Sequence, residues 1–518
     1  MFLYQRGFFD RLGRLPMDLL ENLALGCRVA FSLANLLYCF IGVFMGTLIG
    51  VLPGIGPAGA IAILLPVTFG IDPTSAIIML AGIYYGSQYG GSTTSILVNI
   101  PGEAASVVTT LDGYQMARQG RAGKALGIAA FGSFIAANLA IIPLMILAKP
   151  LSSIAISFGP PEYFAIVVLG LSLLINLAHG SAFKGVIMAI LGFGLSQIGM
   201  DMITGRTRFT FGIIELQGGI ELIPLVMGLF GIGAVLENLG TTFHEVEVLQ
   251  TKLKGLLPSW GDWKNSIGAI IRGSIVGFFL GLIPGGGAIL ASFASYTLEK
   301  QISKHPERFG TGVIEGVAGP ESANNAGAQS NFIPLFVLGI PSNAVMGLLL
   351  GALMIHKVVP GPFFITKHPD IFWGTIVSMY IGNAMLLVLN LPLIPLWVKV
   401  LKIPYRILFP LIFLFCIIGV YSVQNSVFDV VLMILFGIMG FLLKKFKYEI
   451  APLVLAFILG PLAENAFRQC LIMSQGNYFI FLSRPFPLIA LAIALFLFAS
   501  QILPSIRKRR KIIAEIEE

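Results

Sequence analysis

Hydrophobic residues run in long stretches along this chain, interrupted by glycine, proline and small polar residues more often than by charges. From Val29 to Gly102 only Asp72 carries a formal charge. Other charge-free runs cover Ala125–Ala148, Ile371–Val398, Ile407–Phe428 and Pro485–Ile506. A helix needs about 20 residues to cross a hydrocarbon core about 30 Å thick, and these runs do not alternate as membrane β-strands do. The pattern predicts an all-α polytopic membrane protein with about 11–12 transmembrane helices.

One apolar stretch, Gly50–Gly102, is rich in helix breakers. It begins with GVLPGIGP at Gly50–Pro57 and ends with NIPG at Asn99–Gly102. Between them we expect a helix as far as about Gly90 and then a polar turn over Gly90–Thr94. Non-helical backbone at membrane depth survives only where it is buried in protein or lines a cavity. Broken apolar segments of this kind therefore point to the binding site of a transporter.

The same breaks recur later in the chain. GLIPGGGA at Gly281–Ala288 matches the first motif, and GIPS at Gly339–Ser342 matches the second at nearly the same offset. Two motifs repeated in the same order indicate an internal duplication, with two repeat-related re-entrant or broken hairpin regions. The predicted organisation is a lead-in over residues 1–28, a first half over 29–243, a polar connection over 244–265, a second half over 266–506, and a charged tail over 507–518.

Broken helix ends supply the chemistry that an anion and a sodium ion require. Helix N-termini present free N–H groups to anions, and the opposite ends present carbonyl oxygens to Na⁺. The residues expected to contact substrate or ion are Pro53, Gly54, Gly56, Ser92, Thr93, Thr94 and Asn99 in the first half, and Pro284, Gly285, Gly286, Gly287, Asn324, Asn325, Ser330, Asn331, Ser342 and Asn343 in the second. The alternative is that these small and polar residues only pack helices together.

Ionisable residues within the apolar part need separate consideration. Glu321 has two open interpretations: an intramembrane proton or ion carrier, or a helix cap at the water interface. Glu103 and Arg272 flank apolar segments and are expected to be interfacial. Since the repeated motifs themselves contain no clear buried acid, Na⁺ is favoured over H⁺ as the coupling ion, and no other cofactor is expected.

Composition and charge narrow the class further. Only 11% of the 518 residues are charged, against roughly 25% in soluble domains. In a membrane protein, Lys and Arg in the loops report the orientation of the chain in the membrane through the positive-inside rule. The net charge of +8 therefore does not indicate nucleic-acid binding. The basic run Arg507–Lys511 predicts a cytoplasmic C-terminus. The four cysteines form no metal or redox spacing, and the sequence has neither a P-loop nor HExxH, so no enzyme is predicted.

At the broken segments the chain resembles the large membrane subunit of the tripartite tricarboxylate transporters, the TctA family. The residues that carry the resemblance are GVLPGIGPAGAIAILLP at Gly50–Pro66, the segment Tyr84–Leu126, GLIPGGGAILASFASY at Gly281–Tyr296 and the segment Gly319–Leu353.

The resemblance implies inverted repeats and an elevator-like motion. It further implies a small four-helix membrane subunit, a periplasmic solute-binding protein that delivers a carboxylate such as citrate, and import across a bacterial inner membrane, with Na⁺ or H⁺ as coupling ion. Two other interpretations stay open: an organic-anion channel or exporter without ion coupling, and a membrane scaffold or intramembrane enzyme.

Overall fold

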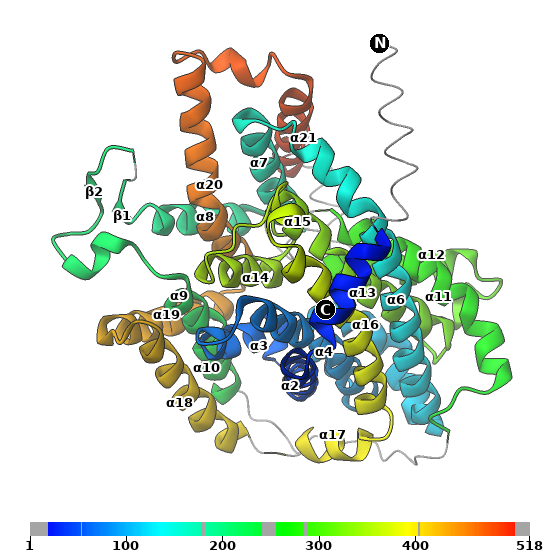
Figure 1. Ribbon diagram of the computed structural model, residues 1–518. Helices are drawn as coiled ribbons and strands as arrows, with labels where there is room; N and C mark the ends of the chain where they lie inside the picture. Colours follow the sequence, from blue (N-terminus) through cyan, green and yellow to red (C-terminus); the bar gives the residue numbers. More distant parts are fainter. Residues whose placement is uncertain are drawn as a thin grey trace, which may run out of the picture.

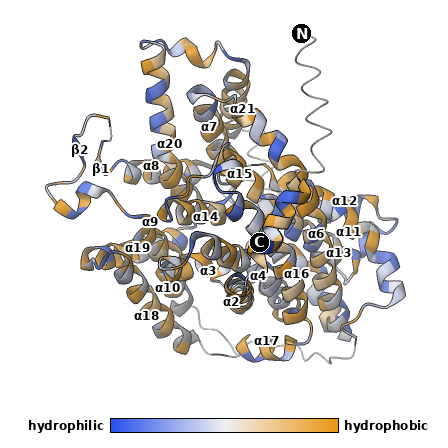
Figure 2. Cartoon of the chain, in the orientation of Figure 1, coloured by the Kyte–Doolittle hydropathy of each residue, from blue (hydrophilic) through white to orange (hydrophobic). Residues whose placement is uncertain are grey.

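The computed structural model describes residues 19–52, 54–177, 182–201, 203–240, 255–283, 287–401, 403 and 405–502. Nearly all of this is helical, and the sheet in the described part is a short antiparallel pair of β1 (Gly199–Met200) and β2 (Thr207–Arg208). Five described helices are long and apolar enough to span a membrane, and seven shorter apolar helices accompany them. Hydrophobic residues cover most helices (Figure 2). The expectation of an all-α polytopic membrane protein is confirmed.

The first half is built from helices and short 3-10 or π turns, which are labelled η. In chain order these elements are α2 (Leu33–Val51), α3 (Gly56–Leu64), η1 (Leu65–Thr68), α4 (Pro73–Val98), η2 (Ala104–Ser106), α5 (Val107–Thr109), η3 (Thr110–Tyr114), η4 (Ala117–Arg121), α6 (Ala122–Ala155), α7 (Pro160–Leu177), α8 (Ala182–Ser196), η5 (Ile214–Gly218), α9 (Leu222–Val226), η6 (Met227–Ile232) and α10 (Gly233–Gly240). A further helix covers 19–30.

The second half begins with the same kind of helix–break–helix unit and then adds helices. Its elements are α11 (Trp260–Gly281), α12 (Gly287–Ile302), η7 (Pro306–Arg308), α13 (Glu315–Ser330), η8 (Pro334–Leu338), α14 (Ala344–Ile355), α15 (Phe364–Lys367), α16 (Pro369–Asn390), α17 (Ile394–Leu401), α18 (Tyr405–Gln424), α19 (Val427–Lys445), α20 (Ala451–Met473), η9 (Tyr478–Phe481) and α21 (Pro485–Ile502). In Figure 1, α11, α12 and α13 lie together beside α6, while α18 and α19 lie on the opposite side of the molecule.

The helix α4 does not break where the sequence suggested. Asp72 caps its start by accepting bonds from the backbone N–H groups of Thr74 (3.0 Å) and Ser75 (3.3 Å), and the helix continues to Val98. The expected turn over Gly90–Thr94 is therefore wrong. The glycines there do not break the helix because they serve its packing.

Glycines on α2 and α4 bring the two helix backbones into contact. A Cβ added to Gly42, Gly46 or Gly50 would lie less than 3.0 Å from backbone carbonyl oxygens of α4. Gly86 and Gly90 face the α2 backbone equally closely. Small residues spaced four apart allow membrane helices to approach at backbone distance, so the first half contains a close-packed glycine seam.

The second half repeats this seam between α11 and α13. A Cβ on Gly273, Gly277 or Gly281 would lie less than 3.0 Å from backbone oxygens of Gly319, Ala323 and Gly327 respectively. Both seams end at the GVLPGIGP-type break, because Gly50 and Gly281 each form the first residue of that motif. The helix that follows each break, α3 or α12, still packs against both helices of its seam.

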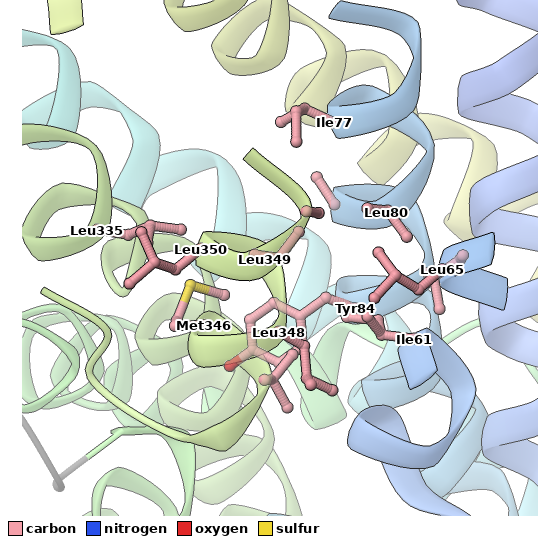
Figure 3. Close-up of a cluster of buried hydrophobic side chains, with 14 of the residues drawn as sticks. Ile61, Leu65, Ile77, Leu80, Tyr84, Leu335, Met346, Leu348, Leu349 and Leu350 are labelled. Atoms are coloured by element: carbon pink, nitrogen blue, oxygen red, sulfur yellow. The ribbon is translucent and has the colours of Figure 1, made fainter. Parts of the chain in front are cut away.

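The two halves pack against each other through the helices next to their breaks. We call residues 33–109 (α2 to α5) the first broken unit and residues 260–355 (α11 to α14) the second. The last helix of the second broken unit, α14, contacts α3 and α4, while α12 contacts η2 and α5 of the first broken unit. Figure 3 shows Leu348 and Leu349 of α14 in one buried cluster with Ile61 of α3 and Tyr84 of α4. These side chains are at most 1% exposed, so an apolar core joins the two broken units.

The polar connection between the halves ends earlier than expected. Of the predicted segment 244–265, residues 244–254 lie outside the described part, and α11 already begins at Trp260. Ser259 and Asp262 form a reciprocal cap at this start. Such a cap satisfies two of the backbone N–H groups that a helix leaves free.

The four cysteines are free thiols. Cys39, Cys416 and Cys470 are buried, and Cys27 is exposed.

Candidate functional site

The two broken units end with the same backbone plan. The chain leaves α4 at Asn99 with φ of 60° and leaves η8 at Gly339 with φ of 70°, and an Ile-Pro pair follows in both places. Four residues after each left-handed residue a side chain caps the next helix. Glu103 accepts from the Ala105 N–H at 2.7 Å, and Asn343 accepts from the Met346 N–H at 2.9 Å. The NIPG and GIPS motifs therefore mark equivalent turns.

Glu321 of α13 points into the first half. Its carboxylate accepts hydrogen bonds from the hydroxyls of Ser92 on α4 (2.5 Å) and Thr109 on α5. Glu321 and Thr109 are fully buried and Ser92 is 5% exposed. The interpretation of Glu321 as an interfacial cap does not fit this position, because the side chain joins the two halves in the interior.

Glu103 forms a second buried acidic position nearby. One carboxylate oxygen accepts from the side-chain amide of Asn324 at 3.0 Å. The Gln88 amide lies 3.0 Å and 3.1 Å from the two carboxylate oxygens and donates to them when its nitrogen faces this group. Glu103 is 7% exposed. The expectation that Glu103 is interfacial is therefore wrong, because the turn after Asn99 carries it back into the protein.

A second contact between the halves joins the second broken unit to α4. Asn331, just after α13, donates to the hydroxyl of Tyr84 at 2.9 Å, and Ser342 donates to Asn331 Oδ1 at 2.9 Å. Asn331 and Ser342 are fully buried and Tyr84 is 1% exposed. Glu321 and Asn331 of the second half thus both hydrogen-bond residues of the first half.

Further polar side chains extend this buried cluster toward α6 and α16. Asn325 donates to the hydroxyl of Ser133 on α6 at 2.7 Å, and Gln329 donates to Asn383 on α16 at 3.3 Å. All four residues are at most 1% exposed. The cluster therefore reaches both broken units and the two long helices that flank them.

Several residues predicted from sequence have structural contacts outside this cluster. Thr94 donates to the Val51 carbonyl at 2.8 Å, and Thr93 donates to the Tyr89 carbonyl at 3.4 Å. Ser330 bonds the carbonyl of Gly327, and Asn99 is an exposed helix cap.

Glycines at the two GVLPGIGP-type breaks have the left-handed backbone that favours this residue. Gly54, Gly56 and Gly287 have φ of 88°, 64° and 52°. The other predicted residues of these breaks, Pro53, Pro284, Gly285 and Gly286, lie outside the described residues.

Sequence reasoning missed several members of the cluster. These are Tyr84, Gln88, Glu103, Thr109, Ser133 and Asn383. One signal was present for Glu103, which follows NIP at the same spacing as the predicted Asn343 follows GIP. The others lie on α4, α5, α6 and α16, and only the tertiary fold brings them together.

The buried carboxylates of Glu103 and Glu321 need a compensating positive charge when they are ionised. In the described part of the chain neither Glu103 nor Glu321 forms an ion pair with a basic side chain. Burying an isolated carboxylate is strongly unfavourable. Each carboxylate therefore calls for a proton or a bound cation, in addition to the hydroxyl and amide donors that it already has.

One end of the cluster suits an anion. The helix α12 starts at Gly287, where an added Cβ would lie 3.3 Å from Asn343 Nδ2 and 3.9 Å from Asn331 Nδ2. A helix start carries free N–H groups and a partial positive charge, and the two amide groups add hydrogen-bond donors. Together they present donors of the kind that bind a carboxylate.

A separate ionic network lies in the loop between α8 and α9. Asp201 accepts from Arg468 of α20 at 3.0 Å and 3.1 Å and also pairs with Arg208, while both arginines contact Glu464 at 2.9 Å. These residues form one wall of a cavity of about 490 Å³ between this loop, α14 and α20. The network fastens the β1–β2 loop to α20.

Acid is expected to weaken this network. The hydrogen bonds from Arg468 hold the pKa of the Asp201 carboxyl well below its ordinary value of 3.8. A carboxyl whose pKa is lower in the folded state stabilises it above the unfolded pKa, and this contribution is lost as pH falls toward the folded pKa. The difference in Tm between wild type and Asp201→Asn should be constant between pH 7 and about pH 5 and shrink below about pH 4. A difference independent of pH would contradict the ionic role.

Comparison with known proteins places this architecture in a family. Residues 36–455 match the model of the "Tripartite tricarboxylate transporter TctA family". A protein of Agrobacterium vitis described as "Uncharacterized 52.8 kDa protein in TAR-I ttuC' 3'region" is 52% identical over 494 residues, which is 95% of this chain and 98% of the relative.

Two further relatives are shorter matches. A second Agrobacterium vitis protein, from the "TAR-II ttuC' 3'region", is 53% identical over 234 residues, covering 45% of this chain and 97% of the relative. A Methanocaldococcus jannaschii protein is 24% identical over 276 residues, covering 52% of this chain and 62% of the relative. No solved structure matches the chain significantly.

Proposed function

This chain belongs to the tripartite tricarboxylate transporter TctA family, and from that premise we propose that it imports tricarboxylates such as citrate, or related carboxylates, by Na⁺-coupled secondary transport. Membership makes it an integral membrane subunit of a tripartite transporter. The proposed partners are a small four-helix membrane subunit and a periplasmic solute-binding protein that delivers the carboxylate. The proposed location is the bacterial inner membrane, with a cytoplasmic C-terminus.

One observation carries the proposal: the two broken units meet in a single buried polar cluster. Glu321 reaches Ser92 of the first half, and Asn331 reaches Tyr84 of the same half. The side chains of Asn331, Asn343 and the start of α12 offer donors to a carboxylate, while the buried Glu103 and Glu321 each need a proton or a cation. The same buried cluster thus offers donors to an anion and carboxylates to a cation or a proton, the two kinds of group that symport requires.

The burial of this cluster favours a carrier over a channel. Glu321, Asn325 and Asn331 are fully buried, so substrate needs a change of conformation to reach them from either side. The glycine seams make each broken unit a closely packed body. We propose that a unit of this kind moves across the membrane with its cargo, in the elevator manner.

Reconstituted uptake tests this function. All three components in proteoliposomes should accumulate radiolabelled citrate when an inward Na⁺ gradient is present at fixed pH, and uptake should collapse when choline replaces Na⁺. Uptake driven only by a proton gradient would contradict Na⁺ coupling. A panel of dicarboxylates covers the substrate class, and no uptake of any carboxylate with either gradient would contradict the transport function.

A further inference from the structure

A small cavity lies between α4, α6 and α16, and two of its lining residues, Ser92 and Ser133, also contact Glu321. Its volume is about 10 Å³, close to the space that one water molecule needs. Three of its lining residues, Leu126, Ala129 and Ala130, are apolar. The polar residues are Tyr89, Ser92, Thr93, Ser133 and Asn390.

Two oxygen atoms of the lining residues lack a hydrogen-bond partner within the described structure. They are the hydroxyl of Tyr89 and the Oδ1 of Asn390, and these side chains are only 3% and 4% exposed. Buried polar atoms are almost always partnered. Because Asn390 Oδ1 can only accept or coordinate, the occupant that satisfies it is a hydrogen-bond donor or a cation.

The electrostatics favour the cation. Ser92, which lines the cavity, donates to the Glu321 carboxylate at 2.5 Å, and the hydroxyl of Ser133 lies 3.4 Å from the Glu321 carbonyl oxygen. That carboxylate has no basic partner in the described chain. A monovalent cation in the cavity would compensate the ionised Glu321 carboxylate, whereas a water molecule would not. A proton on Glu321 would do so without a cation, and measuring Na⁺ binding separates the two cases.

The ligand atoms are of the type that a hard cation prefers. Hydroxyl and amide oxygens suit ions such as Na⁺, whereas softer metals prefer nitrogen and sulfur. We propose that this cavity holds the coupling Na⁺, with Tyr89, Asn390 and the Ser92 and Ser133 hydroxyls as ligands and Glu321 as its counter-charge. This inference rests on the proposed ion-coupled function and assigns the ion to one place in it.

Binding of ²²Na⁺ to the purified full chain in detergent tests the site without substrate or partners. Wild type should bind Na⁺ saturably, with no competition from choline. Tyr89→Phe and Asn390→Leu should each weaken binding about 10-fold or more, as is typical when the surroundings of a metal lose one group. Glu321→Gln, which keeps the shape and removes the charge, should abolish binding.

Tyr85→Phe is the matched control. Tyr85 neighbours Tyr89 on α4 and also has a buried hydroxyl without a partner, but it does not line the cavity. This variant should bind Na⁺ as wild type does. The Tm of each variant in choline separates lost binding from lost folding.

Three results would overturn the inference: no Na⁺ binding by wild type, unchanged binding in both Tyr89→Phe and Asn390→Leu, or equal losses in Tyr85→Phe. Failure of the transport proposal looks different. If the reconstituted protein takes up no carboxylate but the purified chain binds Na⁺ and loses this binding in Tyr89→Phe, the ion site is supported and only the transport proposal fails. If Na⁺ drives carboxylate uptake and Tyr89→Phe needs the same Na⁺ concentration as wild type, only the assignment of Na⁺ to this cavity is contradicted.

Discussion

Replacing Gly277 by leucine is expected to eliminate the folded protein. A Cβ at this position would lie 2.8 Å from the Cα and 2.9 Å from the carbonyl carbon of Ala323, both in the backbone of α13. Backbone cannot move aside as a flexible side chain can, so α11 and α13 would have to separate. Overpacking by a few methylene groups typically costs about 1–3 kcal/mol, and a forced separation of two helices adds lost contacts along the whole seam.

Fluorescence-detected size-exclusion chromatography of the detergent extract measures this loss. The folded peak should disappear for Gly277→Leu and be reduced for Gly277→Ala. Gly194→Ala is the matched control, because Gly194 lies in the helix α8 and nothing is within 4 Å of its added Cβ. A monodisperse Gly277→Leu with the Tm of wild type would show that the seam is not close-packed.

Asn331→Ala is expected to reduce carboxylate uptake strongly. The substitution leaves the buried hydroxyl of Tyr84 without its donor and removes the acceptor of Ser342. Each unsatisfied buried group costs about 1–3 kcal/mol, and the cost falls on the contact between the halves. Uptake in proteoliposomes should fall at least about 10-fold, since each 1.4 kcal/mol corresponds to a factor of ten.

Asn99→Gly provides the comparison for this variant. Asn99 was predicted with Asn331 as a site residue, but its side chain is exposed and its backbone is left-handed. Glycine adopts that conformation freely, and Gly339 occupies the equivalent turn of the second half. Uptake by Asn99→Gly should equal that of wild type. Equal losses in both variants would contradict the assignment of the site to the cross-half cluster.

The positions of the broken units could be predicted from sequence, because breakers are rare in apolar stretches and these recur in order. The all-α membrane class followed from the long charge-free runs. The break at Asn99–Gly102 could also be predicted, since the residue before a proline disfavours helix.

The course of α4 could not be predicted in the same way. Gly86 and Gly90 suggest flexibility in isolation, but in a membrane they allow another helix to approach. A helix break and a close helix contact can be told apart only by the glycines of α2 that lie opposite. Those glycines can be recognised only when it is known that α2 packs against α4. The expected turn over Gly90–Thr94 failed for this reason.

The partners of the buried acids were beyond local reasoning. Glu321 bonds residues more than 200 positions away, and sequence spacing carries no information about such contacts. Glu103 follows a turn and resembles an ordinary interfacial acid. Its burial results from the direction in which the chain continues after Asn99, which depends on packing against the second half.

The placement of the thiols makes this chain convenient for site-directed chemistry. Because Cys39, Cys416 and Cys470 are buried and Cys27 is exposed, Cys27→Ser alone should leave a protein that reacts slowly with polar maleimides. A single cysteine introduced at Ser92 or Asn343 then becomes a reporter of solvent access. Labelling from one side of a sealed vesicle, compared with labelling from the other, would follow the carrier through its cycle.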